Sequence, residues 1–170
     1  MAVARILLVG GGCRGRALAV ELLAEGHAVR ITTRSESARA AIEDAGAECW
    51  VGTPDRLATL RGALDGVTIA CWLLGAASGS HEELMELHRA RLQFFLTQAI
   101  DTTVRGFVYE ARGTSTPAAA LAAGEETVAR LTQLNAIPVA FLRADARERR
   151  EWLAAARAAI ARLLAPRSGG

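Results

Sequence analysis

The sequence contains no lysine, because all 20 of its basic residues are arginine. A Walker A phosphate-binding loop, a Schiff-base lysine and a lysine general acid each require that side chain. Several classes of enzyme are therefore excluded at once.

Cysteine is also scarce, and Cys13, Cys49 and Cys71 form no metal-ligand spacing and leave an odd number for disulfides. Cys49 and Cys71 fall in apolar, strand-like stretches, so we expect both to be small buried side chains. Cys13 lies in a glycine-rich loop. It is either a reactive thiol at a helix start or a spacer residue.

No apolar run reaches the length of a membrane span, and no basic block stands out from a net charge of +2. We therefore expect neither a membrane nor a nucleic acid as partner. The sequence begins with a strand-like segment and no charged leader, which favours a cytoplasmic protein. Its length predicts one domain over residues 1–165, followed by a flexible tail over 166–170.

The most informative segment follows the first apolar run. Gly10, Gly12 and Gly15 have the spacing G-x-G-x-x-G and precede a helical pattern of small residues. In a dinucleotide-binding unit the first glycine permits a tight turn and the second lets backbone approach a pyrophosphate. The third allows close packing of helix on strand. Free N–H groups at the helix start then favour a diphosphate, the alternative being a tight turn that binds nothing.

Strand-like and helix-like segments alternate along the chain. We expect strands at 4–9, 27–33, 47–51, 67–74, 104–110 and 137–143, and helices at 13–25, 35–45, 54–64, 80–100, 117–135 and 145–164. Ser35, Thr53 before Pro54, Ser80 and Asp145 are the expected helix caps. The alternation predicts an α/β fold, a doubly wound parallel six-stranded Rossmann sheet of order 3-2-1-4-5-6.

Ligands of such sheets bind beyond the carboxyl ends of the strands, at the switch between the first and fourth strands. We therefore expect the glycine loop and the ends of strands two, three and four to contact a cofactor. The residues expected to bind it are Gly10, Gly12, Cys13, Arg14, Gly15, Thr33, Arg34, Thr53, Leu74, Gly75 and Ala76.

The residue after the second strand distinguishes the two nicotinamide dinucleotides. An NAD site usually carries Asp or Glu there to accept hydrogen bonds from the ribose hydroxyls. This strand ends in Thr33-Arg34, and an arginine binds a 2′-phosphate bidentately. Arg14 and Arg39 are candidates to contribute to the pocket that would bind this 2′-phosphate. We therefore expect NADP, with NAD less favoured; a solvated surface arginine is the other interpretation of Arg34.

With the strands in this order, the chain up to Asp145 resembles the short-chain dehydrogenase/reductase superfamily. It is most similar to the extended and atypical branches, the sugar-nucleotide epimerases and the NmrA-like regulators. The residues that carry the resemblance are the glycine loop 11–18, the stretch 52–67, the strand end 73–77 and the strands 105–109 and 137–143. The resemblance implies an NAD(P)-binding Rossmann domain, although Val9 stands where the epimerase form has its first glycine and Thr53 replaces an Asp that meets the adenine.

The catalytic residues of that family are missing. Its Tyr-x-x-x-Lys pair follows the fifth strand, whereas this chain has no lysine and its one tyrosine, Tyr109, lies within that strand. Ala111-Arg112 stands where the family has paired serines, and His88 stands about where the family has a helical asparagine. The family's carboxy-terminal substrate lobe has no counterpart in this sequence. The family's usual proton transfer is therefore excluded.

Candidates for the substrate side follow the fifth strand. Arg112, Thr114 and Ser115 either bind an anionic or carbonyl substrate or belong to a loop that caps the next helix. Glu110 is a weaker candidate for a general base. His81 and His88 are seven residues apart on one helix, too far apart for one metal ion.

Three hypotheses for function remain. The chain is a cofactor-binding or sensor protein without turnover, a minimal NADPH-dependent reductase acting directly on a flavin- or quinone-like acceptor, or a degenerate interaction domain with an empty cleft. The helices at 80–100 and 117–135 pair two subunits in the resembled family, and Phe94 and Phe95 widen the apolar surface of the first. We therefore expect a homodimer through these helices.

Overall fold

The computed structural model describes residues 3–167. Its centre is a six-stranded sheet in the order β3-β2-β1-β4-β5-β6, with every pair parallel. The strands are β1 (Arg5–Gly10), β2 (Ala28–Thr33), β3 (Glu48–Val51), β4 (Ile69–Leu73), β5 (Gly106–Glu110) and β6 (Val139–Leu142). The predicted fold class and strand order are confirmed.

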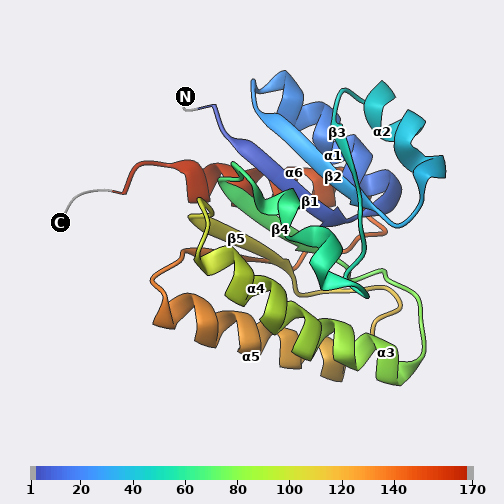
Figure 1. The fold of residues 1–170 in the computed structure, drawn as a ribbon, viewed down its shortest axis with the longest axis vertical. Helices are drawn as coiled ribbons and strands as arrows, with labels where there is room; N and C mark the ends of the chain where they lie inside the picture. The colour runs from blue at the N-terminus through green and yellow to red at the C-terminus, as the bar shows by residue number, and fades with distance from the viewer. Residues whose placement is uncertain (1–2, 168–170) are drawn as a thin grey trace.

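Helices cover both faces of the sheet (Figure 1). One face carries α1 (Gly12–Ala24), α2 (Arg39–Asp44) and α6 (Arg149–Leu164), and the other carries α3 (His81–Glu86), α4 (Leu92–Ile100) and α5 (Ala118–Leu134). Because side chains alternate along a strand, Ile6 and Leu8 face the first group, whereas Leu7 and Val9 face the second. All four are fully buried, as expected of a parallel strand covered on both sides.

The prediction of a helix at 54–64 is wrong, because this stretch forms two short 3₁₀ turns, η2 (Leu57–Leu60) and η3 (Gly62–Leu64). The Thr59 hydroxyl donates to the Arg56 carbonyl at 2.6 Å and accepts from the Thr53 N–H at 2.9 Å. Such local bonds compete with the helical pattern. Gly62 also lies against Trp50, where a Cβ would come within 2.8 Å of the ring. Side-chain bonding and close packing thus replace the expected helix.

Of the four expected caps, those at Ser35 and Ser80 are confirmed, whereas those at Thr53, whose helix does not form, and at Asp145 are wrong. Ser35 accepts from the Ser37 N–H at the start of η1 (Glu36–Ala38), and Ser80 forms a reciprocal capping box with Glu83. The last helix begins only at Arg149, without a side-chain cap. The Asp145 carboxylate instead accepts hydrogen bonds from the backbone N–H and the guanidinium of Arg147. Arg147 precedes the helix, so these bonds do not cap it.

A π-helical turn, η4 (Leu87–Arg91), interrupts the helix expected at 80–100. It holds the fully buried His88, whose Nδ1 lies 2.8 Å from the Tyr109 hydroxyl. That hydroxyl also donates to the Leu121 carbonyl, and Gly124 leaves room for it, since a Cβ there would overlap the oxygen. The pair joins η4, β5 and α5 inside the core, away from solvent.

Within residues 3–167, no helix is long and apolar enough to cross a membrane. Across the same described residues, no three His, Cys, Asp or Glu side chains are grouped to hold a metal ion. Residues 166 and 167 carry no regular structure, and the rest of the tail expected at 166–170 lies outside the described part of the chain.

We expect the fold to lose stability as the pH falls from about 6.5 toward 4. Burial lowers the pKa of His88 to about 4, whereas an unfolded histidine titrates near a pKa of about 6.5. The stabilisation by neutral His88 is fully present above about pH 6.5 and declines by roughly 3 kcal/mol down to about pH 4. Urea unfolding between pH 7.5 and 4.5 measures this change.

The variant His88→Gln should flatten that pH dependence, and the exposed His81→Gln should leave it unchanged. Identical pH dependences for the wild type and His88→Gln would contradict the assignment.

Candidate functional site

The glycine loop turns the chain from β1 into α1 through left-handed backbone. Gly10, Gly11 and Gly12 have φ values of 83°, 94° and 54°, which side chains rarely tolerate. A Cβ on Gly10 would lie 2.8 Å from the Leu73 carbonyl oxygen, and one on Gly15 would lie 3.0 Å from that of Gly10. Gly10 therefore provides the turn, and Gly15 allows α1 to pack closely on the strand end. Gly11, which the fingerprint did not include, is equally required by its φ.

Gly12 differs from the other loop glycines because it faces open space. A Cβ there would meet no atom within 4 Å. Gly12 is the first residue of α1, the helix has no side-chain cap, and its first turn holds no acidic residue. The positive end of the helix dipole is therefore uncompensated and accessible at this point.

A cavity opens on each side of this loop. The strand-end cavity, of 360 Å³, lies between α1 and the ends of β2 and β3, and its lining includes Gly10, Gly12, Arg16, Arg34, Pro54 and Leu74. The loop cavity, of 330 Å³, lies between the glycine loop and the segment after β4, and its lining includes Gly12, Cys13, Arg14, Leu74, Ala76 and Ala77. Gly12 and Leu74 line both, so the two cavities adjoin at the start of α1.

Among the residues that the structure describes, two arginines and no carboxylate line the strand-end cavity. Arg34 lies there, as the sequence predicts, beside Thr33. Arg16 was missed. It lies four residues after Gly12 and hence on the same face of α1, a spacing that could have identified it.

Arg39 lies outside the cavity, although it was expected to contribute. Its guanidinium pairs with Glu36 and Glu43 of its own helical segment. Thr53 also lies outside, whereas its neighbours Gly52 and Pro54 line the cavity. The Thr53 backbone is turned toward Thr59 by their hydrogen bond.

Arg14, predicted to bind the cofactor, lines the loop cavity and not the strand-end cavity, and its guanidinium is paired with Glu110. The Glu110 carboxylate is 1% exposed and accepts from the Arg14 guanidinium at 3.0 Å, the Gly75 N–H at 2.7 Å and the Trp152 indole N–H at 2.8 Å. Arg14 also lies over the Trp152 ring, 4.7 Å from its centroid. Glu110 is thus engaged by three donors, which leaves it unsuited to serve as a general base.

The expected substrate-side residues lie beside the loop cavity but do not line it. Arg112 pairs with Asp145 at 3.2 Å, and Thr114 is exposed. The Ser115 hydroxyl donates to the Ala77 carbonyl at 3.2 Å, so it fastens the loop after β5 to the loop after β4. None of these hydroxyls caps α5, whose N-cap is Pro117.

Gly75 also serves this junction between loops. A Cβ on Gly75 would lie 2.5 Å from the Arg112 carbonyl oxygen, and one on Gly113 would overlap the Gly75 carbonyl. Cys13 is exposed at the rim of the loop cavity, with the Arg16 guanidinium 3.1 Å from its sulfur.

No family model matches the sequence, and no curated protein matches it. Solved structures do match. Triphenylmethane reductase from Citrobacter sp., complexed with NADP(H), is 21% identical with a TM-score of 0.59, over 81% of this chain and 48% of the reductase. Vestitone reductase from alfalfa is 17% identical with a TM-score of 0.61, over 81% of this chain and 55% of vestitone reductase.

UDP-glucose 4-epimerase from Thermotoga maritima, solved with UDP-glucose, is 13% identical with a TM-score of 0.66, over 82% of this chain and 54% of the epimerase. The chain therefore spans about half the length of these proteins. At such identities the likeness shows a shared Rossmann-like fold.

We expect Glu110→Gln to destabilise the fold by about 2–4 kcal/mol, because it leaves the largely buried Arg14 without a counter-charge. Glu125→Gln is the matched control, since it removes an exposed ion pair with Arg143 and should change stability by less than about 1 kcal/mol. Denaturant unfolding of both variants measures the difference. Equal effects would show that the Glu110 contacts contribute no more than a surface pair.

Proposed function

We propose that this chain binds NADP(H) as a Rossmann protein of the short-chain dehydrogenase/reductase superfamily, atypical branch. The observation that carries the proposal is the pair of adjoining cavities at Gly12. The uncapped start of α1 lies between them, where a diphosphate is favoured by the helix dipole and the free N–H groups. A Cβ on Gly12 would project into the open space beside these N–H groups, so the residues present leave room for the group.

The charges of the strand-end cavity favour NADP over NAD. Arg16 and Arg34 line it without a carboxylate, and guanidinium groups bind a phosphate but cannot accept hydrogen bonds from ribose hydroxyls. Triphenylmethane reductase, solved with NADP(H), supplies a precedent for this cofactor on this fold.

Cofactor binding without turnover is the form of the proposal that the residues favour. Bound NADPH supplies a hydride, but a carbonyl reduction also needs a proton donor at the acceptor. Tyr109 is fully buried on the α5 side of the sheet, and burial raises the pKa of its hydroxyl. Glu110 is occupied by its three donors.

A minimal reductase is the alternative, because the loop cavity leaves room beside Ala76 and Ala77 for a flavin- or quinone-like acceptor that needs no tyrosine acid. Oxidation of NADPH on adding such an acceptor would establish this alternative. A degenerate domain that binds no dinucleotide is the second alternative.

We further propose a cytoplasmic homodimer through the helices at 80–100 and 117–135. Phe94 and Leu134 are exposed on these helices, by 51% and 74%, which supports an apolar contact there.

Gly12→Ala should weaken NADPH binding at least roughly tenfold while the fold persists, because the added methyl enters the space proposed for the diphosphate. Gly26→Ala is the matched control: Gly26 also has positive φ and open space where a Cβ would lie, but it follows the other end of α1. Calorimetric titration compares them. A wild-type protein that binds neither NADPH nor NADH would overturn the proposed function.

Arg34→Gln should weaken NADPH binding about tenfold and change NADH binding less than about twofold, since only NADPH carries the 2′-phosphate. Arg39→Gln, which removes a nearby arginine outside the cavity, should change neither affinity. Equal losses for both nucleotides in Arg34→Gln would contradict a role in reading the 2′-phosphate.

A further inference from the structure

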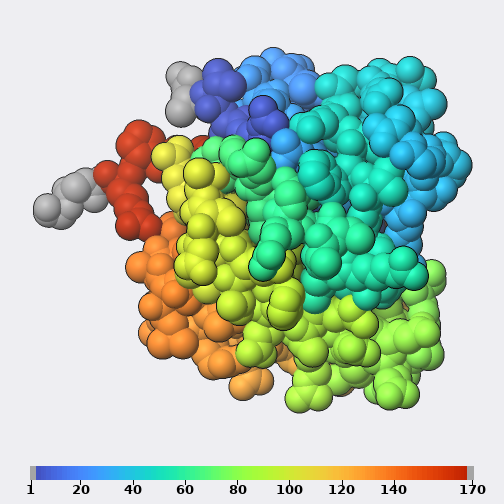
Figure 2. All heavy atoms as spheres, in the orientation of Figure 1, coloured from blue at the N-terminus to red at the C-terminus, as the bar shows by residue number. Residues whose placement is uncertain are grey.

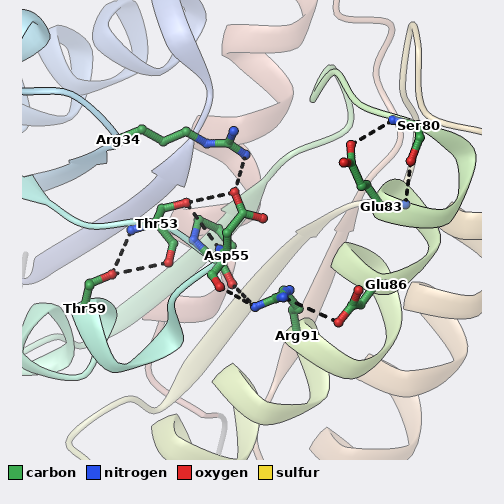
Figure 3. A network of polar contacts seen from close by, with 9 residues as sticks. Arg34, Thr53, Asp55, Thr59, Ser80, Glu83, Glu86 and Arg91 are labelled. Carbon is green, nitrogen blue, oxygen red and sulfur yellow. Dashed lines mark hydrogen bonds and ion pairs between the residues drawn. The ribbon is translucent and has the colours of Figure 1, made fainter.

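The loop after β3 carries a carboxylate, Asp55, that pairs with the arginine proposed to read the cofactor. Asp55 Oδ2 lies 3.3 Å from the Arg34 guanidinium (Figure 3). Arg34 lines the strand-end cavity, and both residues line a further cavity of 290 Å³ on the side toward α3. The ion pair therefore stands at the boundary between these two cavities.

The backbone of Asp55 is anchored from across the molecule. Arg91, in the π-helical turn η4, donates from Nη1 to the carbonyls of Pro54 at 3.2 Å and Asp55 at 2.6 Å, and pairs with Glu86 (Figure 3). In the space-filling view the surface of residues 52–60 lies directly against that of the α3–α4 segment (Figure 2). The loop is thus tied to a helix rather than held by its own turn alone.

The Asp55 side chain is also held locally. The Asp55 backbone N–H donates to Thr53 Oγ1 at 3.2 Å, and the same hydroxyl donates to the side-chain oxygen Asp55 Oδ2 at 3.3 Å. The turn at Asp55 is therefore bonded both by Arg91 and by Thr53, which favours a carboxylate that stays near Arg34.

The Arg34–Asp55 pair is nevertheless exchangeable. The side chains are 61% and 56% exposed, so water screens their attraction and the pair contributes little to stability. A 2′-phosphate carries a larger negative charge than a carboxylate and accepts from an arginine bidentately. It would take over Arg34 but would then lie beside the fixed carboxylate, which repels it.

On the premise of the proposed function, we infer that Asp55 is a specificity-determining residue, which lowers the preference for NADP(H) by competing for Arg34 and repelling the 2′-phosphate. NADH carries a neutral hydroxyl in place of this phosphate, so Asp55 does not repel it. The loop after β3, and not only the residue after β2, sets the ratio of the two affinities.

The test is calorimetric titration of the full chain with NADPH and with NADH. Asp55→Asn keeps the shape of the side chain and should tighten NADPH binding about fivefold, leaving NADH within about twofold. In the double variant Arg34→Gln/Asp55→Asn the gain for NADPH should vanish. Asp101→Asn, which neutralises an exposed carboxylate at the end of α4, is the matched control for net charge and should show no gain.

The outcomes separate this inference from the proposed function. A wild type that binds neither nucleotide overturns the proposed function itself. A wild type that binds NADPH, with Asp55→Asn unchanged or weaker, overturns only the inference, because Asp55 would then be neutral or would orient Arg34 for the phosphate. Equal tightening of NADPH and NADH, or a gain that survives in the double variant, also overturns it. Thermal unfolding of each variant confirms that the fold is retained.

Discussion

The buried carboxylate of Glu110 is the constraint on which the ligand-binding edge depends. An interior charge is tolerated only when donors surround it, and Arg14, the Gly75 N–H and Trp152 provide them. These donors come from the glycine loop, the end of β4 and α6, so one side chain at the end of β5 holds three other segments in place. Its removal would leave the Gly75 N–H, Arg14 and Trp152 without this acceptor.

This arrangement also decides what the glycine loop presents to a ligand. Because Arg14 is turned toward Glu110 and Trp152, the start of α1 exposes backbone N–H groups next to Gly12 rather than a side chain. The cations near the strand-end cavity are then Arg16 and Arg34, one from α1 and one from the end of β2. The positions proposed for a diphosphate, at Gly12, and for a 2′-phosphate, at Arg34, therefore lie apart along the sheet edge.

The elements that the sequence predicted well are those whose signals are local. The alternation of apolar runs with helical patterns was sufficient to predict the strand order of the sheet. The Ser80–Glu83 capping box is formed by residues within one four-residue segment. The 3₁₀ turns at 57–64 were not predictable in the same way. They depend on Thr59 bonding back to Thr53 and on Gly62 packing under Trp50, and these contacts exist only once β3 is in place. The π turn around His88 likewise depends on Tyr109 from another strand.

The sequence by itself determined the fold class, the position of the glycine turn and the identity of the residue after β2, because spacing and residue type carry that information along the chain. Only the tertiary structure decided that Arg14, Arg34 and Arg112 are paired with Glu110, Asp55 and Asp145, which lie 21 to 96 positions away from them in the chain. Ion pairing over such separations is set by where strand ends meet at one edge of a parallel sheet. No pattern of neighbouring residues records it.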